Sequence, residues 1–333
     1  MRLLRPGLLG VIALPALFAA GMSAADAAGT RLTVMSFNIY GGGANEGKPV
    51  DETVAAIRAV GADIIAVQET RLEGHPCTAD VCPAGGPSVT QAIAAALRYH
   101  YYEQTAENSA LWANAVISRF PIVGATPNDL GVAINVYGRT VYAFNLHLDD
   151  SPYQPYQLLR IRYGKWPFIT TEREAIHYAR LARGEAVKLW KQDLTSARGA
   201  AAAFVFGDFN EPSHRDWTQA AADIGRHPIR VRYPTTRAIE RKGFIDAYRA
   251  VWPDEIAKPA FTWTPTTSPD DPDDHHDRID FVFVRGAGLK VKSAAIVGEK
   301  APEADIVVTP WPSDHRAVAA TVRFGSRPPI GRR

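Results

Sequence analysis

Cysteine is scarce in this sequence, and neither sign of charge is in clear excess. The 333 residues include two cysteines, 37 Lys or Arg and 35 Asp or Glu. A near-neutral chain does not indicate a dedicated nucleic-acid binder, which more often has a clear basic excess. There is also no low-complexity tract, internal repeat or Gly/Ser-rich linker, so the composition predicts one folded domain.

The N-terminus has the pattern of a secretion signal. Arg2 and Arg5 form a short positive region, and Leu8–Ala20 is an apolar run too short to span a bilayer comfortably. Ala25–Ala27 provides an A-x-A cleavage pattern. An uncleaved anchor is the alternative. No later segment is apolar enough to cross a membrane, so we expect an exported protein, extracellular or periplasmic, without stable membrane insertion.

The predicted organisation is a cleaved signal peptide over residues 1–27, one catalytic domain over residues 28–326 and a C-terminal tail over residues 327–333. Cleavage would remove two arginines and one aspartate, which leaves 35 basic and 34 acidic residues and a net charge of +1. We expect a monomer.

The two cysteines, Cys77 and Cys82, lie in a Gly/Pro-rich stretch. In an exported protein an even number of cysteines favours a disulfide, which here would close a small surface loop. A metal-binding pair is the alternative, but no further cysteine is near.

The chain is organised around the stretch Ala201–Glu211. Its apolar beginning predicts a strand buried on both faces, which stops at Gly207 and delivers Asp208 and Asn210. Period-two alternation sends these two side chains to the same side. A carboxylate at the end of a buried strand is unfavourable unless a charged or hydrogen-bonding group meets it.

Other predicted strands also end in polar residues. Strands over Arg31–Asn38, Asp63–Val67 and Thr140–Leu148 end at or beside Asn38, Glu69 and His147, and Asp314 with His315 precedes a last strand over Ala317–Phe324. Asp280 lies inside an apolar strand. Helices are predicted over Asp51–Val60, from a capping box at Thr171 to about Leu194, and from Ser213 to Ile224. Alternating strands and helices indicate an α/β fold.

Polar ends of neighbouring strands can converge on one site. Carboxylate and amide oxygens without a Cys/His cluster are typical ligands of a hard cation. We therefore expect Mg²⁺ as the cofactor, with Mn²⁺ as the alternative. A zinc site is not favoured, because the sequence has no His-x-x-x-His or cysteine pattern.

Taken together, these motifs resemble the endonuclease/exonuclease/phosphatase superfamily, which has the DNase-I-like fold. The resemblance runs from about Arg31 to Phe324. It is carried, in order, by Ser36-Phe37-Asn38, Val67-Gln68-Glu69, Asn114 to Arg119, Asn145-Leu146-His147, Gly207-Asp208-Phe209-Asn210, Arg278 to Phe281 and Ser313-Asp314-His315. Each motif alone is weak, but their common order is a specific signal.

The resemblance implies a four-layer α/β/β/α sandwich of two packed sheets and attack of water on a phosphoester. It implies that Glu69 is the main Mg²⁺ ligand with Asn38 beside it, and that Asp314 lies near the metal or a second ion. It further implies that His315 is the general base and that Asp280 orients it, which suits an imidazole near neutral pH.

By the same resemblance, Asp208 would position the water or the leaving group, and Asn210 and His147 would donate to phosphoryl oxygens. Asn114 and Arg119 also match and would support the site from behind. Alone, Asn38 or Asn210 is more often a turn residue. The His275-His276-Asp277 run could be a second metal site or a solvated loop.

The segment Ser151–Thr170 follows His147 closely and is the candidate for setting the substrate. Its aromatic Tyr156 and Trp166 could stack on bases or a sugar, and Arg160 and Arg162 could hold phosphates. The same mixture could face a lipid headgroup or pack as a lid.

We therefore expect a secreted, Mg²⁺-dependent phosphodiesterase of nuclease type whose partner is a phosphoester, nucleic acid among them. A sphingomyelinase-like lipid phosphodiesterase and a small-molecule or inositol phosphatase are the alternatives. A non-catalytic binding protein on the same scaffold would be expected to have lost Glu69, Asp208 or His315, and none is substituted.

Overall fold

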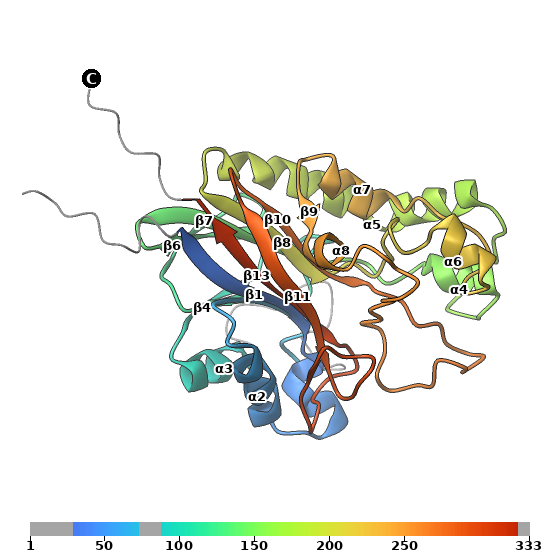
Figure 1. Ribbon diagram of the computed structural model, residues 1–333, viewed down its shortest axis with the longest axis horizontal. Coiled ribbons are helices and arrows are strands. Elements are labelled where there is room, and N and C mark those ends of the chain that lie inside the picture. The colour runs from blue at the N-terminus through green and yellow to red at the C-terminus, as the bar shows by residue number, and fades with distance from the viewer. Residues whose placement is uncertain (1–28, 73–87, 326–333) are drawn as a thin grey trace, which may run out of the picture.

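Two β-sheets packed face to face form the centre of the protein, and helices cover their outer faces (Figure 1). The computed structural model describes residues 29–72 and 88–325. The predicted signal peptide, the C-terminal tail and the pair Cys77 and Cys82 lie outside these residues. The four layers are the predicted α/β/β/α sandwich, so the fold class is confirmed.

The first sheet has seven strands in the order β12-β11-β13-β1-β2-β4-β3. β1 runs parallel to β2 and antiparallel to β13, and β2 runs antiparallel to β4. The strands are β1 (Thr30–Asn38), β2 (Ile64–Gln68), β3 (His100–Gln104), β4 (Asn114–Ser118), β11 (Lys290–Gly298), β12 (Ile306–Val307) and β13 (Ala317–Phe324).

The second sheet has six strands in the order β5-β6-β7-β8-β10-β9. β7 and β8 are parallel, so their carboxyl ends lie at the same edge, and β10 runs antiparallel to β8. The strands are β5 (Ile122–Ala125), β6 (Gly131–Val136), β7 (Arg139–His147), β8 (Ala202–Asp208), β9 (Ile245–Asp246) and β10 (Asp280–Arg285).

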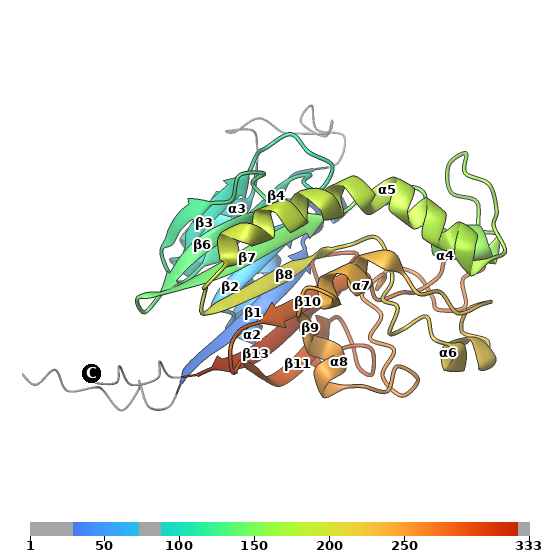
Figure 2. The same cartoon turned by 90° about the horizontal axis from the view of Figure 1, so that it is seen from above.

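Helices α2 (Val50–Val60) and α3 (Thr90–Leu97) pack on the first sheet, and α5 (Glu172–Asp193) crosses the second (Figure 2). The capping box predicted at Thr171 is present: its hydroxyl accepts from the Glu174 N–H, and the Glu174 carboxylate accepts from the Thr171 N–H. The remaining helices are η1 (Tyr40–Glu46), α4 (Gln154–Leu159), η2 (Leu194–Ala197), α6 (Gln219–Asp223), α7 (Pro234–Glu240) and α8 (Ala247–Val251).

The helix predicted from Ser213 is wrong in its start. The Ser213 hydroxyl accepts from the N–H of Arg215 in a local turn instead. The helix begins five residues later, where the Thr218 hydroxyl accepts from the N–H of Ala221. Both residues are good N-caps, and only the following chain direction distinguishes them.

The main core lies between the two sheets. It contains Leu32 and Val34 of β1, Phe204 and Phe206 of β8 and Val282 of β10, all buried. Because successive side chains of a strand alternate between faces, the next inward-facing positions are Ser36 and Asn38, Asp208, and Asp280. The inner faces are therefore apolar along most of their length and become polar at one edge.

Within the two described stretches, 29–72 and 88–325, none of the helices is both long and apolar enough to cross a bilayer.

Candidate active site

Asp208 stands at the centre of the polar edge. It pairs directly with His147 on the parallel strand β7 and with Asp280 on the antiparallel strand β10. Gly207 precedes it with a φ of +145°, and a Cβ there would lie 1.8 Å from the Leu146 carbonyl oxygen. Only glycine fits this close approach of β7 and β8, and it places Asp208 between its two neighbours.

Glu69 approaches Asp208 from the other sheet. It follows the end of β2 with a φ of +56°, a left-handed conformation that non-glycine residues rarely adopt. Asn38, fully buried at the end of β1, donates from Nδ2 to Glu69 Oε1 at 2.8 Å and to Asp208 Oδ2 at 3.1 Å. One amide therefore joins the two carboxylates across the sheets.

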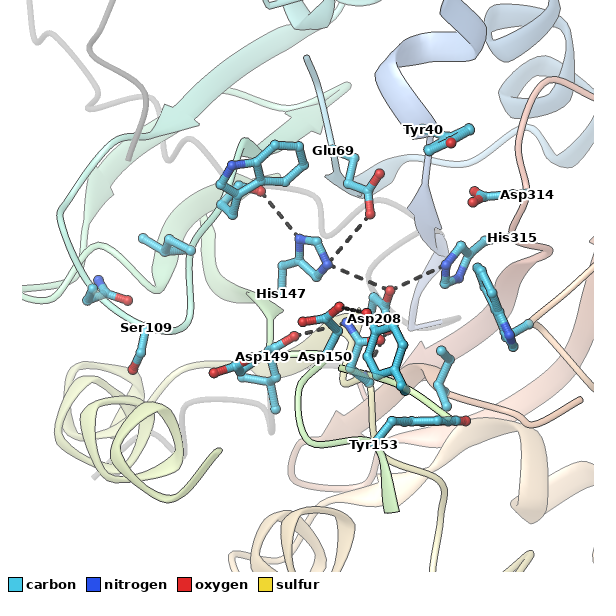
Figure 3. Close-up of a pocket in the computed structure, with 18 of the residues that line it drawn as sticks. Tyr40, Glu69, Ser109, His147, Asp149, Asp150, Tyr153, Asp208, Asp314 and His315 are labelled. Atoms are coloured by element: carbon cyan, nitrogen blue, oxygen red, sulfur yellow. Dashed lines mark hydrogen bonds and ion pairs between the residues drawn. The ribbon is translucent and has the colours of Figure 1, made fainter. Parts of the chain in front are cut away.

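His147 and His315 lie on either side of Asp208 (Figure 3). His147 Nε2 is 3.8 Å from Asp208 Oδ2 and 3.7 Å from Glu69 Oε1, and its Nδ1 lies 3.4 Å from the Trp112 carbonyl oxygen. His315 Nε2 is 3.5 Å from Asp208 Oδ2. Both rings thus present Nε2 to the same carboxylate.

Asp280 holds His315 from behind. Asp280 Oδ2 is 2.9 Å from His315 Nδ1, and both side chains are buried. The Asp280 N–H donates to Thr262 Oγ1, while its Oδ1 has no hydrogen-bond partner among the described residues. The predicted pairing of a buried carboxylate with the histidine is therefore present, and it leaves Nε2 as the ring atom that faces the site.

The carboxylates of the site shift one another's protonation. Burial raises the pKa of Glu69 above its ordinary value, and it raises the pKa of Asp314 to about 7. Burial opposes the charged form of His315, but the carboxylates of Asp280, Asp208 and Asp314 outweigh it and hold the pKa of His315 well above its ordinary range. The site therefore carries negative charge that lacks compensation.

The donor set fits a divalent cation. Glu69 Oε2 is buried and has no hydrogen-bond partner in the described part of the chain. Ligand atoms of Glu69, His147 and Asp208 all lie within 4.8 Å of one another, as do those of Asp208, Asp280 and His315. Carboxylate oxygens with excess negative charge are what a hard ion requires. Asn38 offers its N–H groups to the carboxylates, while its oxygen accepts from the Tyr40 N–H, so in this arrangement it positions the other ligands.

Asn210 and Asp314 complete the predicted set. The Asn210 N–H donates to Asp208 Oδ1 at 2.9 Å, and its Nδ2 donates to the Leu148 carbonyl at 3.0 Å. Asp314 lines the pocket beside His315. The neighbouring Ser313 fixes this turn, because its hydroxyl donates to the Asn38 carbonyl and accepts from the His315 N–H.

Asn145 has a positioning role that the sequence argument did not assign. It is buried on β7, and it accepts from Gln68 Nε2 at 2.6 Å and donates to the carbonyls of Val67 and Ala115. It therefore fixes the second sheet against β2 and β4 of the first. A buried amide inside an apolar strand was the available signal, the same one that pointed to Asp280.

The two matched residues of the β4 region have different outcomes. Asn114, at the site end of β4, is buried, and its amide is placed to donate to the Trp112 carbonyl and to accept from the His147 N–H. Arg119 lies beyond the opposite end of β4, where it pairs with Asp63 at 2.9 Å and with the Tyr99 hydroxyl. The expectation that Arg119 supports the site is therefore wrong.

The His275-His276-Asp277 run is neither a metal site nor a solvated loop. Both Asp277 oxygens are already bonded, one to the Tyr153 hydroxyl at 2.8 Å and one to Trp217 Nε1 at 2.7 Å. Burial lowers the pKa of His275 to about 4. The run is buried structure behind the pocket wall.

An open pocket of about 1380 Å³ lies over the polar edge. Of the predicted substrate-binding residues, Tyr156 lines it, while Arg160, Arg162 and Trp166 are not among its lining residues. The two guanidinium groups lie over the ring of Phe168, at 5.4 and 5.0 Å, and Trp166 Nε1 donates to Ser151 Oγ at 2.9 Å. The lining also includes residues not predicted from the sequence: Tyr40, Glu107, Trp112, Asp149, Asp150, Tyr153, Tyr163 and Trp263.

The comparison with known families agrees with the fold and the site. A sequence profile described as "Endonuclease/Exonuclease/phosphatase family" matches residues 35–315. This range runs from β1 to His315 and includes every predicted catalytic or metal-binding residue. A phosphoesterase fold is thus joined to a phosphoesterase site, and the chain belongs to the endonuclease/exonuclease/phosphatase family.

Known relatives are distant in sequence. An uncharacterized protein of Caenorhabditis elegans, F14F9.5, is 27% identical over 315 residues, which covers 88% of this chain and 91% of that protein. An endonuclease/exonuclease/phosphatase from Beutenbergia cavernae has a TM-score of 0.50 at 19% identity, over 89% of this chain and 72% of that one. TDP2 of D. rerio, solved with a single-strand DNA product, has a TM-score of 0.51 at 16% identity, over 88% and 99%. These likenesses show the fold.

Proposed function

We propose that this protein is a divalent-metal-dependent phosphodiesterase in which water attacks phosphorus and His315 is the general base. The observation that carries the proposal is the arrangement around Asp208. A buried Asp280–His315 pair lies on one side of it, and Glu69, with an unpartnered carboxylate oxygen, lies on the other. Attack on a phosphoester needs both a proton acceptor and compensation of charge, and this edge offers both.

The residues divide the proton transfer among them. With Nδ1 held by Asp280, His315 accepts the water proton at Nε2, and the carboxylate stabilises the resulting imidazolium. Asp208, 3.5 Å from that nitrogen, orients the water. As the new O–P bond forms, the ester P–O bond breaks and the departing alkoxide takes a proton from solvent.

His147 and Asn210 stabilise the charge that develops on the phosphoryl oxygens. His147 presents Nε2 to the site, and Asn210 keeps one side-chain N–H beyond the one it gives to Leu148. Glu69, with Asp208 nearby, would hold Mg²⁺ or Mn²⁺, and Asp314 would lie near that ion or a second one. When bound, a divalent cation neutralises phosphoryl charge and acts as a Lewis acid.

This assignment requires a cation for a reason internal to the chain. The surrounding carboxylates favour the protonated form of His315, and a protonated imidazole cannot serve as a base. Compensation of Glu69 and Asp208 lowers the pKa of the ring and frees Nε2.

Among substrates, single-stranded DNA is the first to test, because the similar TDP2 of D. rerio was solved with a single-strand DNA product. This is the nuclease-type activity expected from the motifs. A lipid phosphodiesterase and a small-molecule or inositol phosphatase are the other candidates, and the charge of the pocket favours one of them, as argued in the next subsection.

We also propose that the protein is exported. The charged and apolar pattern of residues 1–27 and the A-x-A motif support cleavage before Ala28, and an oxidising compartment would allow a disulfide between Cys77 and Cys82. N-terminal sequencing of the mature protein should begin at or near Ala28, and mass spectrometry should find a gain of two protons on reduction. A retained N-terminus would contradict export by cleavage.

Hydrolysis of bis-p-nitrophenyl phosphate in Mg²⁺ tests the activity, with p-nitrophenyl phosphate as the monoester control. We expect the diester to be cleaved and His315→Ala to lower kcat by roughly 10²- to 10⁴-fold, the usual contribution of a general base. Wild-type activity in His315→Ala would reject its role. Cleavage of the monoester alone would reject the diesterase assignment.

A further inference from the structure

The pocket over the predicted catalytic residues is acidic. Among its lining residues, all of which lie in the described part of the chain, none is Lys or Arg. Residues 73–87, which follow the Glu69 loop, also contain no Lys or Arg. The carboxylates that line the pocket are Glu69, Glu107, Asp149, Asp150, Asp208 and Asp314. Nucleic acids are normally bound through Lys and Arg contacts to several phosphates, so this lining does not favour a polyanion.

The segment Ser151–Thr170 contributes an aromatic wall to this pocket. The rings of Tyr153 and Tyr156 are 4.9 Å apart at 89°, and those of Tyr156 and Tyr163 are 5.9 Å apart at 86°. Perpendicular neighbours of this kind form corners, in which more than one ring face can surround a group. All three tyrosines line the pocket.

Carboxylates stand beside this wall and close to the catalytic residues. The Tyr163 hydroxyl donates to Asp150, and the Ser151 N–H donates to Asp149 at 3.0 Å. Asp150 is three residues after His147, so a span of at most roughly 11 Å separates them along the chain. Figure 3 shows Asp149, Asp150 and Tyr153 together on the side of Asp208 that is away from Glu69.

The arginines of the same segment do not neutralise these carboxylates. Arg160 and Arg162 lie over Phe168, and neither lines the pocket. The segment therefore presents tyrosine rings and a carboxylate to the pocket and keeps its cations elsewhere. Aromatic faces combined with negative charge are the usual recognition chemistry for an ammonium group.

We propose that the substrate is a phosphodiester of which one alcohol arm carries an ammonium group, such as a choline ester. Its phosphate lies at Glu69 and His315, and its ammonium group lies against Tyr153, Tyr156 and Tyr163 beside Asp150. This inference rests on the proposed phosphodiesterase activity. Water replaces one alcohol at phosphorus, so the products are that alcohol and a phosphomonoester. The same arm occurs in free glycerophosphodiesters and in lipid headgroups.

A matched pair of probes tests the charge alone. p-Nitrophenyl phosphocholine carries the ammonium arm, and p-nitrophenyl 3,3-dimethylbutyl phosphate replaces its nitrogen by carbon with nearly the same shape. With the full-length mature protein and Mg²⁺, we expect kcat/KM for the charged ester to exceed that of the neutral one by at least about tenfold, the size of a desolvated cation–π contact.

Two variants locate the effect. Asp150→Asn should lower kcat/KM for the choline ester about fivefold and leave the neutral ester unchanged. Tyr156→Ala should do the same, more strongly. Glu185→Gln is the matched control, because it removes an exposed carboxylate of α5 that pairs with Lys188 on the helix surface, and it should change neither substrate.

The substrate source is decided by two further arms, sn-glycero-3-phosphocholine in solution and vesicles of sphingomyelin or phosphatidylcholine. Hydrolysis of either supports the inference and identifies the source. Equal rates for the charged and neutral probes, or an Asp150→Asn effect on both, would overturn it. Cleavage of single-stranded DNA without a preference for the choline ester would overturn it but leave the phosphodiesterase in place. Failure to cleave any diester in Mg²⁺ or Mn²⁺ would refute both.

Discussion

Replacement of Asp280 by asparagine separates the chemistry of the site from its stability. Asp280→Asn keeps the size of a fully buried side chain but removes the carboxylate 2.9 Å from His315 Nδ1. The ring then loses the group that fixes its tautomer and stabilises its charged form. We expect kcat to fall by roughly 10²- to 10⁴-fold, the range spanned by general-base catalysis.

The fold should tolerate this change. Asp280 Oδ1 has no hydrogen-bond partner among the described residues, and burial raises the pKa of its carboxyl, so the ionised form is unfavourable in the native protein. The variant loses one charged hydrogen bond, which costs at most about 3 kcal/mol. It also removes a buried negative charge, which offsets part of that loss.

The assay combines three measurements on wild type and variant. Hydrolysis of bis-p-nitrophenyl phosphate gives kcat, urea unfolding gives stability, and the imidazole NMR signal of His315 gives its pKa. That pKa should fall in the variant, because a major source of its elevation is gone. A variant with kcat within threefold of wild type, while its His315 pKa falls as expected, would refute the role of the pair.

Three other perturbations probe the charge of the site. In wild type, Mg²⁺ at 100 times its dissociation constant should raise the free energy of unfolding by about 2.7 kcal/mol, and Glu69→Gln should abolish this gain; an undiminished gain would show that the ion binds elsewhere. Excess EDTA should eliminate activity, and either Mg²⁺ or Mn²⁺ should restore it; activity that persists in EDTA would rule out a metal-dependent mechanism. Asp314 has a folded pKa of about 7 against an ordinary value of 3.8, so the native state retains its proton longer than the unfolded chain. In EDTA, wild type should therefore lose up to about 4 kcal/mol relative to Asp314→Asn between pH 4 and pH 7; urea midpoints with no such difference would contradict the shift.

Much of the site was predictable because the strand pattern is regular. Asp208 and His147 end parallel neighbours, so their meeting at one edge follows from topology. Asp280 was visible as a carboxylate in an apolar strand, where only a partner could make it tolerable. The order of the motifs then selected one family, and the family selected the two-sheet fold.

Contacts between distant loops were not predictable from the same pattern. Tyr153 and Trp217 meet at Asp277, 124 and 60 residues away from it in the chain, and no local rule specifies such a meeting. The direction of Arg160 and Arg162 depends on Phe168, which holds them over its ring. Arg119 was misplaced because a motif specifies order along the chain and not which end of a strand faces the site.

Asn38 and the Asp280–His315 pair have a consequence for how the molecule assembles. Asn38 of the first sheet donates to Asp208 of the second, and His315, just before β13 of the first, bonds Asp280 of the second. The reaction centre therefore exists only in the seam, and a sheet folded alone would possess half of it. Cation binding should act as a clasp on that seam and slow hydrogen exchange in both sheets together, at amides far from the bound ion.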